Sequence, residues 1–299
     1  MRYFKYLAFI IVFLYPVLSF SQQSYTILQR FITLKKTLNW SDYEEKMSDA
    51  RKIQTLNSIT LSDSLTEYNE TLEDFFPLDT SAIYFLDVNF DGRQDLVYHG
   101  MVSYTQYSTK IYINVDGVFQ FAEEYYGLTK HVEIDHSNKN IRIWVHEPPC
   151  CDSYTHSLMQ YDLSDKGECL LRERILFLDP NGRRFLGVAE FKTENAAIVN
   201  SDSRLYIRRD EFKGHAYFGN PDKTEEMTAK LRDPKVEFID IADLPAGLKV
   251  FVLDQKKVKG ETWQFVLTDK AGKLENSLFE RWQVRNNPNN QYLGWIKKE

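Results

Sequence analysis

The chain has 299 residues, a formal net charge of −6 at pH 7, and 18 tyrosines, 20 phenylalanines and 5 tryptophans. An acidic chain without a basic footprint is not expected to bind nucleic acid. The aromatic content is enough for a sizeable core, and the length favours two or three domains.

Residues 1–21 have the features of a signal peptide. Arg2 and Lys5 precede an apolar run over residues 7–18, and two serines then stand at the positions that a signal peptidase reads. We expect cleavage before Gln22, which changes the formal charge from −6 to −8 because it removes two basic residues and no acidic one. An uncleaved anchor is the alternative, but the run is shorter than the roughly 20 residues of a membrane span. The predicted product is exported, periplasmic or secreted, and has no membrane span.

Residues 25–77 are predicted to be helical. Apolar side chains recur there at helical spacing: Ile27, Leu28, Phe31, Leu34 and Leu38. The pattern from Ser41 to Glu44 is typical of a capping box and predicts the start of a second helix. Residues 61–76 are expected to form a third helix, which ends before Pro77.

Residues 80–215 are predicted to be an antiparallel β-rich domain. The apolar period changes to two, and an Asp116-Gly117 turn separates strand-like residues 110–114 from residues 118–121, as in a β-hairpin. We expect further strands at residues 82–86, 96–98, 132–134, 141–145, 155–163, 169–177, 197–199 and 205–208.

The most specific pattern in the chain is an acidic loop between the first two of these strands. Oxygen-bearing side chains recur at nearly every second residue, and Gly92 stands where the loop must turn with a positive φ. Ca²⁺ binds six to eight oxygen ligands in such loops. We predict calcium as the cofactor, bound by the side chains of Asp87, Asn89, Asp91 and Asp95 and by the backbone carbonyl of Arg93.

This loop resembles the DxDxDGxxDL loop of FG-GAP and VCBS-type repeats. The similarity covers about residues 82–121, because a strand that ends in Asn114 and a turn at Gly117 and Phe119 follow as in those repeats. It differs from an EF-hand, which needs a glutamate where Tyr98 stands. The resemblance implies one propeller-blade-like unit within the β-domain, since only one copy is found. An acidic hairpin without a metal is the alternative.

The three cysteines, Cys150, Cys151 and Cys169, are candidates for one disulfide in an exported protein. The adjacent pair can form a vicinal bridge, or either member can pair with Cys169 across a hairpin. A catalytic cysteine and a zinc site that uses His146 and His156 are the weaker alternatives.

Residues 216–236 are predicted to be a linker with a short helix, followed by a small domain at 237–299. This last segment resembles a bacterial SH3-like domain, because Trp263 begins a strand and Gly294 and Trp295 stand at the close of the chain as in that family. The resemblance implies a small β-barrel with a ligand groove, for which Trp263, Tyr292 and Trp295 are the candidates. Tyr292 is expected to be exposed.

The predicted fold is therefore mainly β, with an N-terminal helical segment, an antiparallel β-domain and an SH3-like β-barrel. The predicted function is that of an exported, non-catalytic binding protein that recognises peptide, a cell-wall component or an envelope protein. A secreted hydrolase with an unrecognised active site in residues 80–215 is the alternative.

Overall fold

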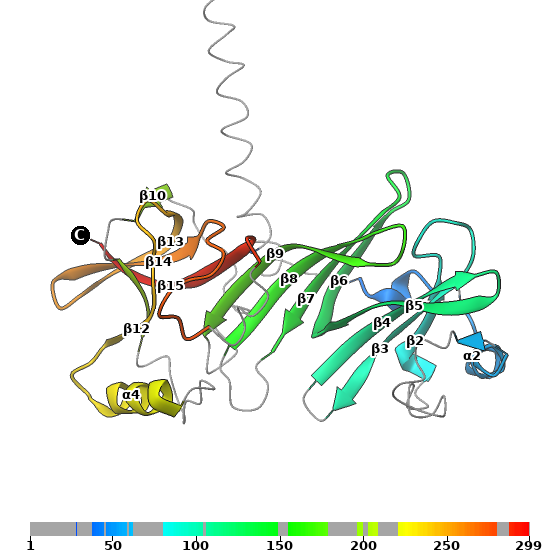
Figure 1. Cartoon of the computed structure of the whole chain (residues 1–299), viewed down its shortest axis with the longest axis horizontal. Helices are drawn as coiled ribbons and strands as arrows, with labels where there is room; N and C mark the ends of the chain where they lie inside the picture. The colour runs from blue at the N-terminus through cyan, green and yellow to red at the C-terminus, as the bar shows by residue number, and fades with distance from the viewer. Residues whose placement is uncertain are drawn as a thin grey trace, which may run out of the picture. The chain divides into compact units, whose positions relative to one another are not determined.

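The computed structural model describes residues 28, 38–44, 46–58, 60–61, 80–103, 106–148, 155–178, 196–199, 203–208, 221–279 and 287–298 (Figure 1). The chain divides into two compact units, residues 36–174 and residues 1–35 with 175–299. The fold is mainly β and its sheets are rich in antiparallel pairs, as predicted. The predicted signal peptide lies outside the described residues. Among those described, no helix is long and apolar enough to cross a membrane.

The unit of residues 36–174 contains two β-sheets. The first sheet has the order β1-β5-β4-β3-β2, and the second contains β6, β7, β8 and β9 as successive neighbours, with residues 169–174 of β9 in this unit. The strands are β1 (Thr60–Leu61), β2 (Ile83–Leu86), β3 (Asp95–Ser103), β4 (Gln106–Val115), β5 (Val118–Tyr126), β6 (Leu128–Asp135), β7 (Asn140–Glu147), β8 (Thr155–Leu163) and β9 (Cys169–Leu178). The strands expected in this region are confirmed, and so is the turn at Asp116 and Gly117, both of which have positive φ.

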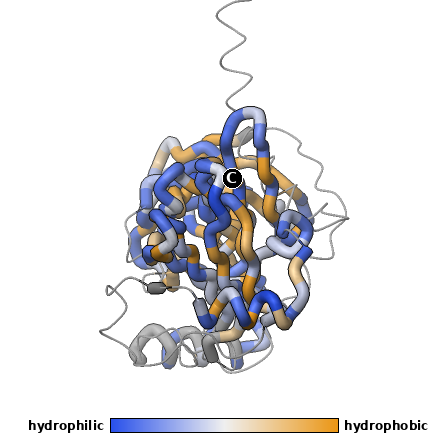
Figure 2. Tube along the Cα trace, turned by 90° about the vertical axis from the view of Figure 1, so that its right-hand side faces the viewer, coloured by the Kyte–Doolittle hydropathy of each residue, from blue (hydrophilic) through white to orange (hydrophobic). Residues whose placement is uncertain are grey.

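The core of this unit lies between the two sheets. Val97 and Ile111 of the first sheet belong to the same buried cluster as Ile143, Val145 and Met159 of the second. Leu96, Tyr98 and Tyr112, their neighbours in β3 and β4, belong to a second buried cluster, so alternate residues of the first sheet enter different clusters. Figure 2 shows hydrophobic and hydrophilic residues changing along the tube. A period of two therefore produces two facing apolar surfaces here.

The helical segment is shorter than predicted. Instead of a helix from Ser41, the chain forms a 3-10 turn, η1 (Trp40–Asp42), and α2 (Asp49–Leu56) begins only after Ser48, whose side chain accepts the Arg51 N–H. A second 3-10 turn, η3 (Thr80–Ala82), precedes β2. Leu61, where a third helix was expected, lies in β1 and pairs with Phe119 in parallel; most of the rest of that predicted helix is outside the described residues.

The predicted helix over residues 27–38 lies almost entirely outside the described residues. Tertiary contacts explain why the second predicted helix does not begin at Ser41. Trp40 is fully buried in the core between the sheets, and the Val132 N–H of β6 donates to the Leu38 carbonyl at 2.8 Å. The hydroxyl of Tyr43 donates to the Val132 carbonyl at 3.1 Å. Residues 38–43 are thus bonded to β6 through Leu38 and Tyr43. These contacts hold the segment beside the strand, and a regular helix from Ser41 does not form there.

A buried ion pair attaches α2 to the first sheet. The Nζ atom of Lys52 lies 2.8 Å from Glu44 Oε1, and the two side chains are only 7% and 10% exposed. Lys52 also donates to the Ile83 carbonyl at 2.8 Å, and Glu44 accepts the Phe85 N–H at 3.2 Å. Both charges are therefore hydrogen-bonded to β2, which offsets part of the cost of burying them.

The second unit has one further set of paired strands and a helix. Neighbouring strands run in the order β10-β13-β14-β15, while β11 pairs with β12 along its length and with β15 at one position, Tyr206 opposite Trp295. The elements are β10 (Ala196–Ile198), β11 (Arg204–Arg208), α4 (Pro221–Arg232), β12 (Phe238–Asp243), β13 (Lys249–Val258), β14 (Glu261–Thr268) and β15 (Asn290–Lys298). The expected short helix near residues 216–236 is present as α4.

The domain boundaries predicted around residues 215 and 237 differ from the structure. The strands β10 and β11 pair with β13, β12 and β15, and so they belong to the C-terminal unit. A module of residues 237–299 would therefore lack two of its strands. Over the described part of the chain the strands do not close into the predicted SH3-like barrel.

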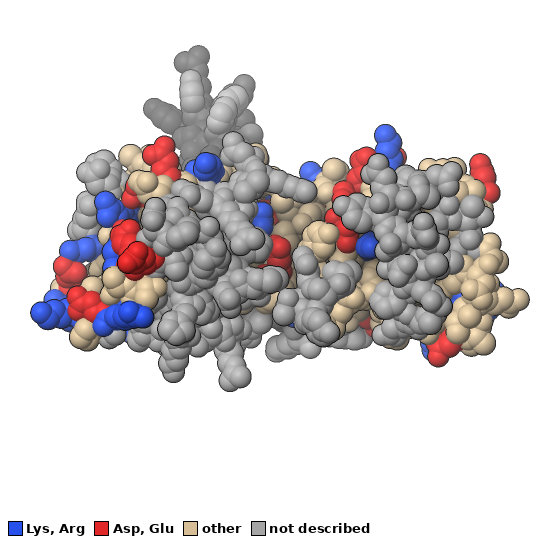
Figure 3. Space-filling view, turned by 60° about the horizontal axis from the view of Figure 1, so that its bottom comes forward, with Lys and Arg blue, Asp and Glu red and all other residues tan. Residues whose placement is uncertain are grey.

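Contacts between neighbouring elements hold the C-terminal unit together. Gly294 of β15 is required because a Cβ atom there would lie 2.7 Å from the Leu205 side chain and 3.0 Å from the Tyr206 carbonyl oxygen. Lys230 of α4 donates to Asp240 of β12 at 2.8 Å. Figure 3 shows basic and acidic side chains beside one another over this part of the surface.

We predict that Lys52→Met lowers the free energy of unfolding by about 3–5 kcal/mol, because it leaves the Glu44 carboxylate buried without a cation. Urea unfolding followed by tryptophan fluorescence measures the loss. The double variant Lys52→Met with Glu44→Gln should recover most of the lost free energy of unfolding. The glutamine side chain carries no charge to bury, and its amide oxygen can still accept the Phe85 N–H. Lys46→Met changes an exposed lysine and is the control. A loss below about 0.5 kcal/mol in Lys52→Met would contradict a stabilising role for the pair.

Candidate functional site

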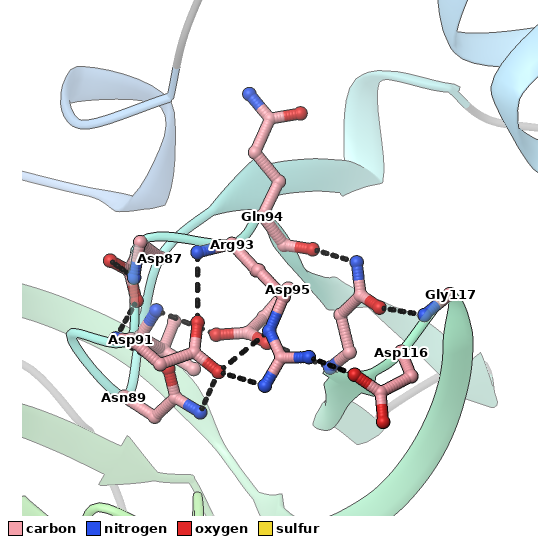
Figure 4. Close-up of polar contacts among 11 residues, drawn as sticks. Asp87, Asn89, Asp91, Arg93, Gln94, Asp95, Asp116 and Gly117 are labelled. Atoms are coloured by element: carbon pink, nitrogen blue, oxygen red, sulfur yellow. Dashed lines mark hydrogen bonds and ion pairs between the residues drawn. The ribbon is translucent and has the colours of Figure 1, made fainter.

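The predicted calcium loop is the connection between two paired strands, β2 and β3. Leu86 pairs with Asp95, so the intervening residues form a hairpin loop that turns back on itself (Figure 4). Gly92 has a φ of +87°, as expected, and Phe90 has a φ of +61°. The Phe90 ring lies edge-on to the His136 ring of the β6–β7 turn, with 5.8 Å between ring centroids. This ring contact joins the loop to the β6–β7 turn.

Three of the predicted ligands meet on the exposed side of the loop. The Asp91 N–H donates to Asp87 Oδ1 and to Asn89 Oδ1, at 3.1 Å in each case. The Gly92 N–H donates to Asp87 Oδ2 at 2.8 Å. The loop is thus wound around the Asp87 carboxylate, and the oxygens of Asp87 and Asn89 share one donor. The structure brings these side chains together as the sequence predicted.

Asp95 lies behind them and is completely buried. Its Oδ2 accepts the Val88 N–H at 2.9 Å, and its Oδ1 accepts the Asn114 N–H of β4 at 2.8 Å. Burial raises the pKa of Asp95 to about 6; the two backbone hydrogen bonds lower it, and the charges of Asp91 and Asp87 raise it further. Asp95 therefore fixes the loop to β4, a role that its place in the motif did not reveal.

Arg93 contributes a contact that the sequence analysis missed. Its Nε and Nη2 atoms lie 3.1 and 2.9 Å from Asp91 Oδ2, and its Nη1 atom lies 2.8 Å from Asp116 Oδ1. The Arg93 N–H donates to Asp91 Oδ1 at 2.8 Å. Hydrogen bonds from Arg93 lower the pKa of Asp91, and those to Asp91 and Asp116 raise the pKa of Arg93. The predicted use of the Arg93 carbonyl remains a prediction.

The neighbouring hairpin turn completes the site. Asn114 donates from Nδ2 to the Gln94 carbonyl at 3.0 Å and accepts the Gly117 N–H at 2.9 Å (Figure 4). These bonds join the β4–β5 turn to the acidic loop and place Asp116 within reach of Arg93. The sequence contained a signal for this, because Asn114 and Gly117 are among the residues that resemble the repeat family, but it did not reveal their partners.

The loop carries side-chain oxygen atoms, the kind of ligand that a hard cation such as Ca²⁺ prefers. Asp87, Asn89 and Asp91 each offer side-chain oxygen, and both oxygens of Asp87 and Oδ1 of Asp91 keep a lone pair after accepting one N–H. In the part of the chain that the structure describes, no group of three or more His, Cys, Asp and Glu side chains is arranged to hold a metal ion. The calcium prediction therefore rests on the oxygen atoms of the loop, and in the structure these atoms accept hydrogen bonds from the protein itself.

His146 and His156, the two histidines of the alternative zinc site, form a buried pair. His146 of β7 and His156 of β8 are nearly parallel, and His146 Nε2 lies 3.0 Å from His156 Nδ1. Burial, together with the charges of His156 and Lys130, lowers the pKa of His146 to about 3. A third histidine, the partly buried His99, has its Nδ1 atom 2.7 Å from the Thr109 hydroxyl, and desolvation lowers its pKa to about 4.

Cys150 and Cys151 lie outside the described residues, so the catalytic, zinc and disulfide predictions that involve them stay predictions. Cys169 is a free cysteine at the start of β9 and packs against the core between the sheets. Burial raises the pKa of its thiol, which disfavours the thiolate that disulfide exchange requires.

The candidate ligand groove does not match the structure. Tyr292 is fully buried rather than exposed, and its hydroxyl donates to the Gly272 carbonyl at 2.6 Å. Trp263 is 6% exposed and stacks on Phe238 with 3.6 Å between ring centroids; Trp295 is 4% exposed and lies edge-on to Phe238. The three predicted groove residues are thus interior packing groups.

Comparisons with known proteins do not assign the chain to a family. No protein-family model matches the chain, and no curated protein matches it.

We predict that acid destabilises the protein partly through His146. The unfolded chain takes up a proton near pH 6.5, whereas buried His146 does so only near pH 3, so the stability from this residue is present above pH 6.5 and is lost as the pH falls. Between pH 6.5 and pH 5 the loss amounts to at most about 2 kcal/mol. Urea unfolding at pH 7 and pH 5 should show a smaller pH difference for His146→Gln than for the wild type. His136→Gln, which replaces an exposed histidine, is the control. An unchanged difference in His146→Gln would contradict this assignment.

Proposed function

We propose that the protein is an exported, non-catalytic binding protein whose N-terminal β-unit is stabilised by calcium at the loop of residues 87–95. The observation that supports this most directly is the meeting of Asp87, Asn89 and Asp91 on the exposed side of the loop, above the buried Asp95. Export follows from the expected signal peptide.

The electrostatics of the loop favour a divalent cation. Asp87, Asp91 and Asp95 lie close enough for the first two to raise the pKa of the third, and Arg93 is the basic side chain that contacts the loop carboxylates. Carboxylates crowded in this way repel one another in their charged forms, and a bound Ca²⁺ offsets that repulsion. The exposed oxygens of Asp87, Asn89 and Asp91 would contact the ion, while Asp95 would hold the loop in position.

The C-terminal unit is the proposed site of recognition, with a surface different from the predicted groove. Since Trp263 and Trp295 are buried, the half-buried aromatic residues around them form its accessible part: Tyr206, Phe238 and Phe265. Lys256 lies over the Trp295 ring, 5.2 Å from its centroid, and provides a cation at the same surface. Aromatic residues with a nearby cation are suited to peptide or cell-wall ligands.

We predict that millimolar calcium raises the melting temperature of the purified protein by several degrees relative to chelator. A ligand present at a hundredfold excess over its Kd stabilises the native state by about 2.7 kcal/mol. Asp87→Asn, which keeps the size of the side chain but removes one charge from the loop, should lose most of this shift. Asp165→Asn, in the exposed β8–β9 turn, is the charge-matched control and should keep it. The absence of a calcium-dependent shift in the wild type would rule out a structural calcium site.

We predict that the purified protein co-sediments with cell wall or captures an envelope protein, and that Phe238→Ala weakens this binding. The Phe238 side chain is only partly buried, so its removal should cost less stability than removal of either tryptophan. A pull-down with purified cell wall and with envelope proteins as separate baits measures the binding, and Tyr126→Ala, an exposed aromatic of the other unit, is the control. Equal loss in both variants, or binding unaffected by Phe238→Ala, would move the recognition surface away from the C-terminal unit.

A further inference from the structure

The guanidinium group of Arg93 occupies the charge-balancing position of the acidic loop. Two of its nitrogens, Nε and Nη2, lie 3.1 and 2.9 Å from the same oxygen, Asp91 Oδ2. Asn89 Nδ2 donates to that oxygen as well, at 3.1 Å. Asp91 Oδ2 therefore has three donors, more than any other carboxylate oxygen of the loop.

A residue outside the loop keeps the guanidinium there. Asp116, in the β4–β5 turn, accepts Nη1 of Arg93 at 2.8 Å, so that the guanidinium lies between two carboxylates. Asn114 fixes the distance between the turn and the loop through its bonds to the Gln94 carbonyl and the Gly117 N–H. The position of Arg93 is thus set by the hairpin as well as by the loop.

In this arrangement the Arg93 guanidinium and a divalent cation would compete for the Asp91 carboxylate. An ion bound by Asp87, Asn89 and Asp91 would need an oxygen of Asp91, and it would lie a few ångströms from a positive charge. Like charges at such separations repel appreciably even in water, although salt screens the effect. In the absence of the ion, the same guanidinium reduces the repulsion between Asp91 and its acidic neighbours.

We propose that Arg93 is a built-in counter-ion that holds the calcium-free loop in its folded form and weakens its affinity for calcium. This inference rests on the proposed calcium function. It assigns Arg93 two opposite effects, one on the calcium-free protein and one on the bound protein. A residue with a merely structural role would weaken both states.

The test is calcium binding by isothermal titration calorimetry, together with melting temperature in chelator, on the whole purified protein. Arg93→Gln removes the charge but leaves the backbone carbonyl that the sequence proposes as a ligand. We expect it to bind calcium roughly tenfold more tightly than the wild type and to melt at a lower temperature in chelator. Arg93→Lys keeps the charge and should bind with an affinity close to that of the wild type. Lys257→Gln removes an exposed charge in the other unit and is the control for net charge.

The possible results separate this inference from the proposed calcium function. If the wild type binds calcium and Arg93→Gln binds equally or more weakly, Arg93 does not oppose binding and the inference is wrong, while the calcium function stands. If neither protein binds calcium, the calcium function is wrong and the inference falls with it. If only Arg93→Gln binds, the wild-type arginine blocks the site, which supports the inference against a calcium function in the native protein.

Discussion

The buried carboxylate of Asp95 is the constraint on which the acidic loop depends. One of its oxygens accepts a backbone N–H from the loop, at Val88, and the other accepts one from β4, at Asn114. A charged group without exposure is costly unless such bonds compensate it. Because both oxygens are used in this way, the loop can take only positions that keep Val88 and Asn114 on either side of Asp95.

This constraint connects the loop to the rest of its unit. Asn114 is also bonded to Gln94 and Gly117, so the turn after β4 is fixed relative to the loop before β3. Phe90 then reaches the second sheet at His136. The loop is therefore held by contacts from two other hairpins, β4–β5 of its own sheet and β6–β7 of the second sheet.

Buried polar groups recur elsewhere in the same unit and serve similar purposes. Lys52 and Glu44 attach α2 to β2, and His146 and His156 pair between β7 and β8. In each case a polar atom of one segment bonds to a partner in another part of the unit rather than to solvent. Such contacts specify how the elements pack, because an alternative packing would leave buried polar groups without partners.

The sequence by itself determined the alternation of the strands, the Asp116-Gly117 turn, and the gathering of Asp87, Asn89 and Asp91 in one loop. These features depend on side-chain period and on turn residues, which act over a few neighbouring positions. Tertiary structure alone decided that Trp40 is buried in the core, where the helix predicted from Ser41 does not form, and that Tyr292 is buried. It also decided that β10 and β11 pair with C-terminal strands and that Arg93 contacts Asp116. Each of these outcomes depends on a partner far away in the chain, and local sequence carries no information about which distant residue will lie opposite.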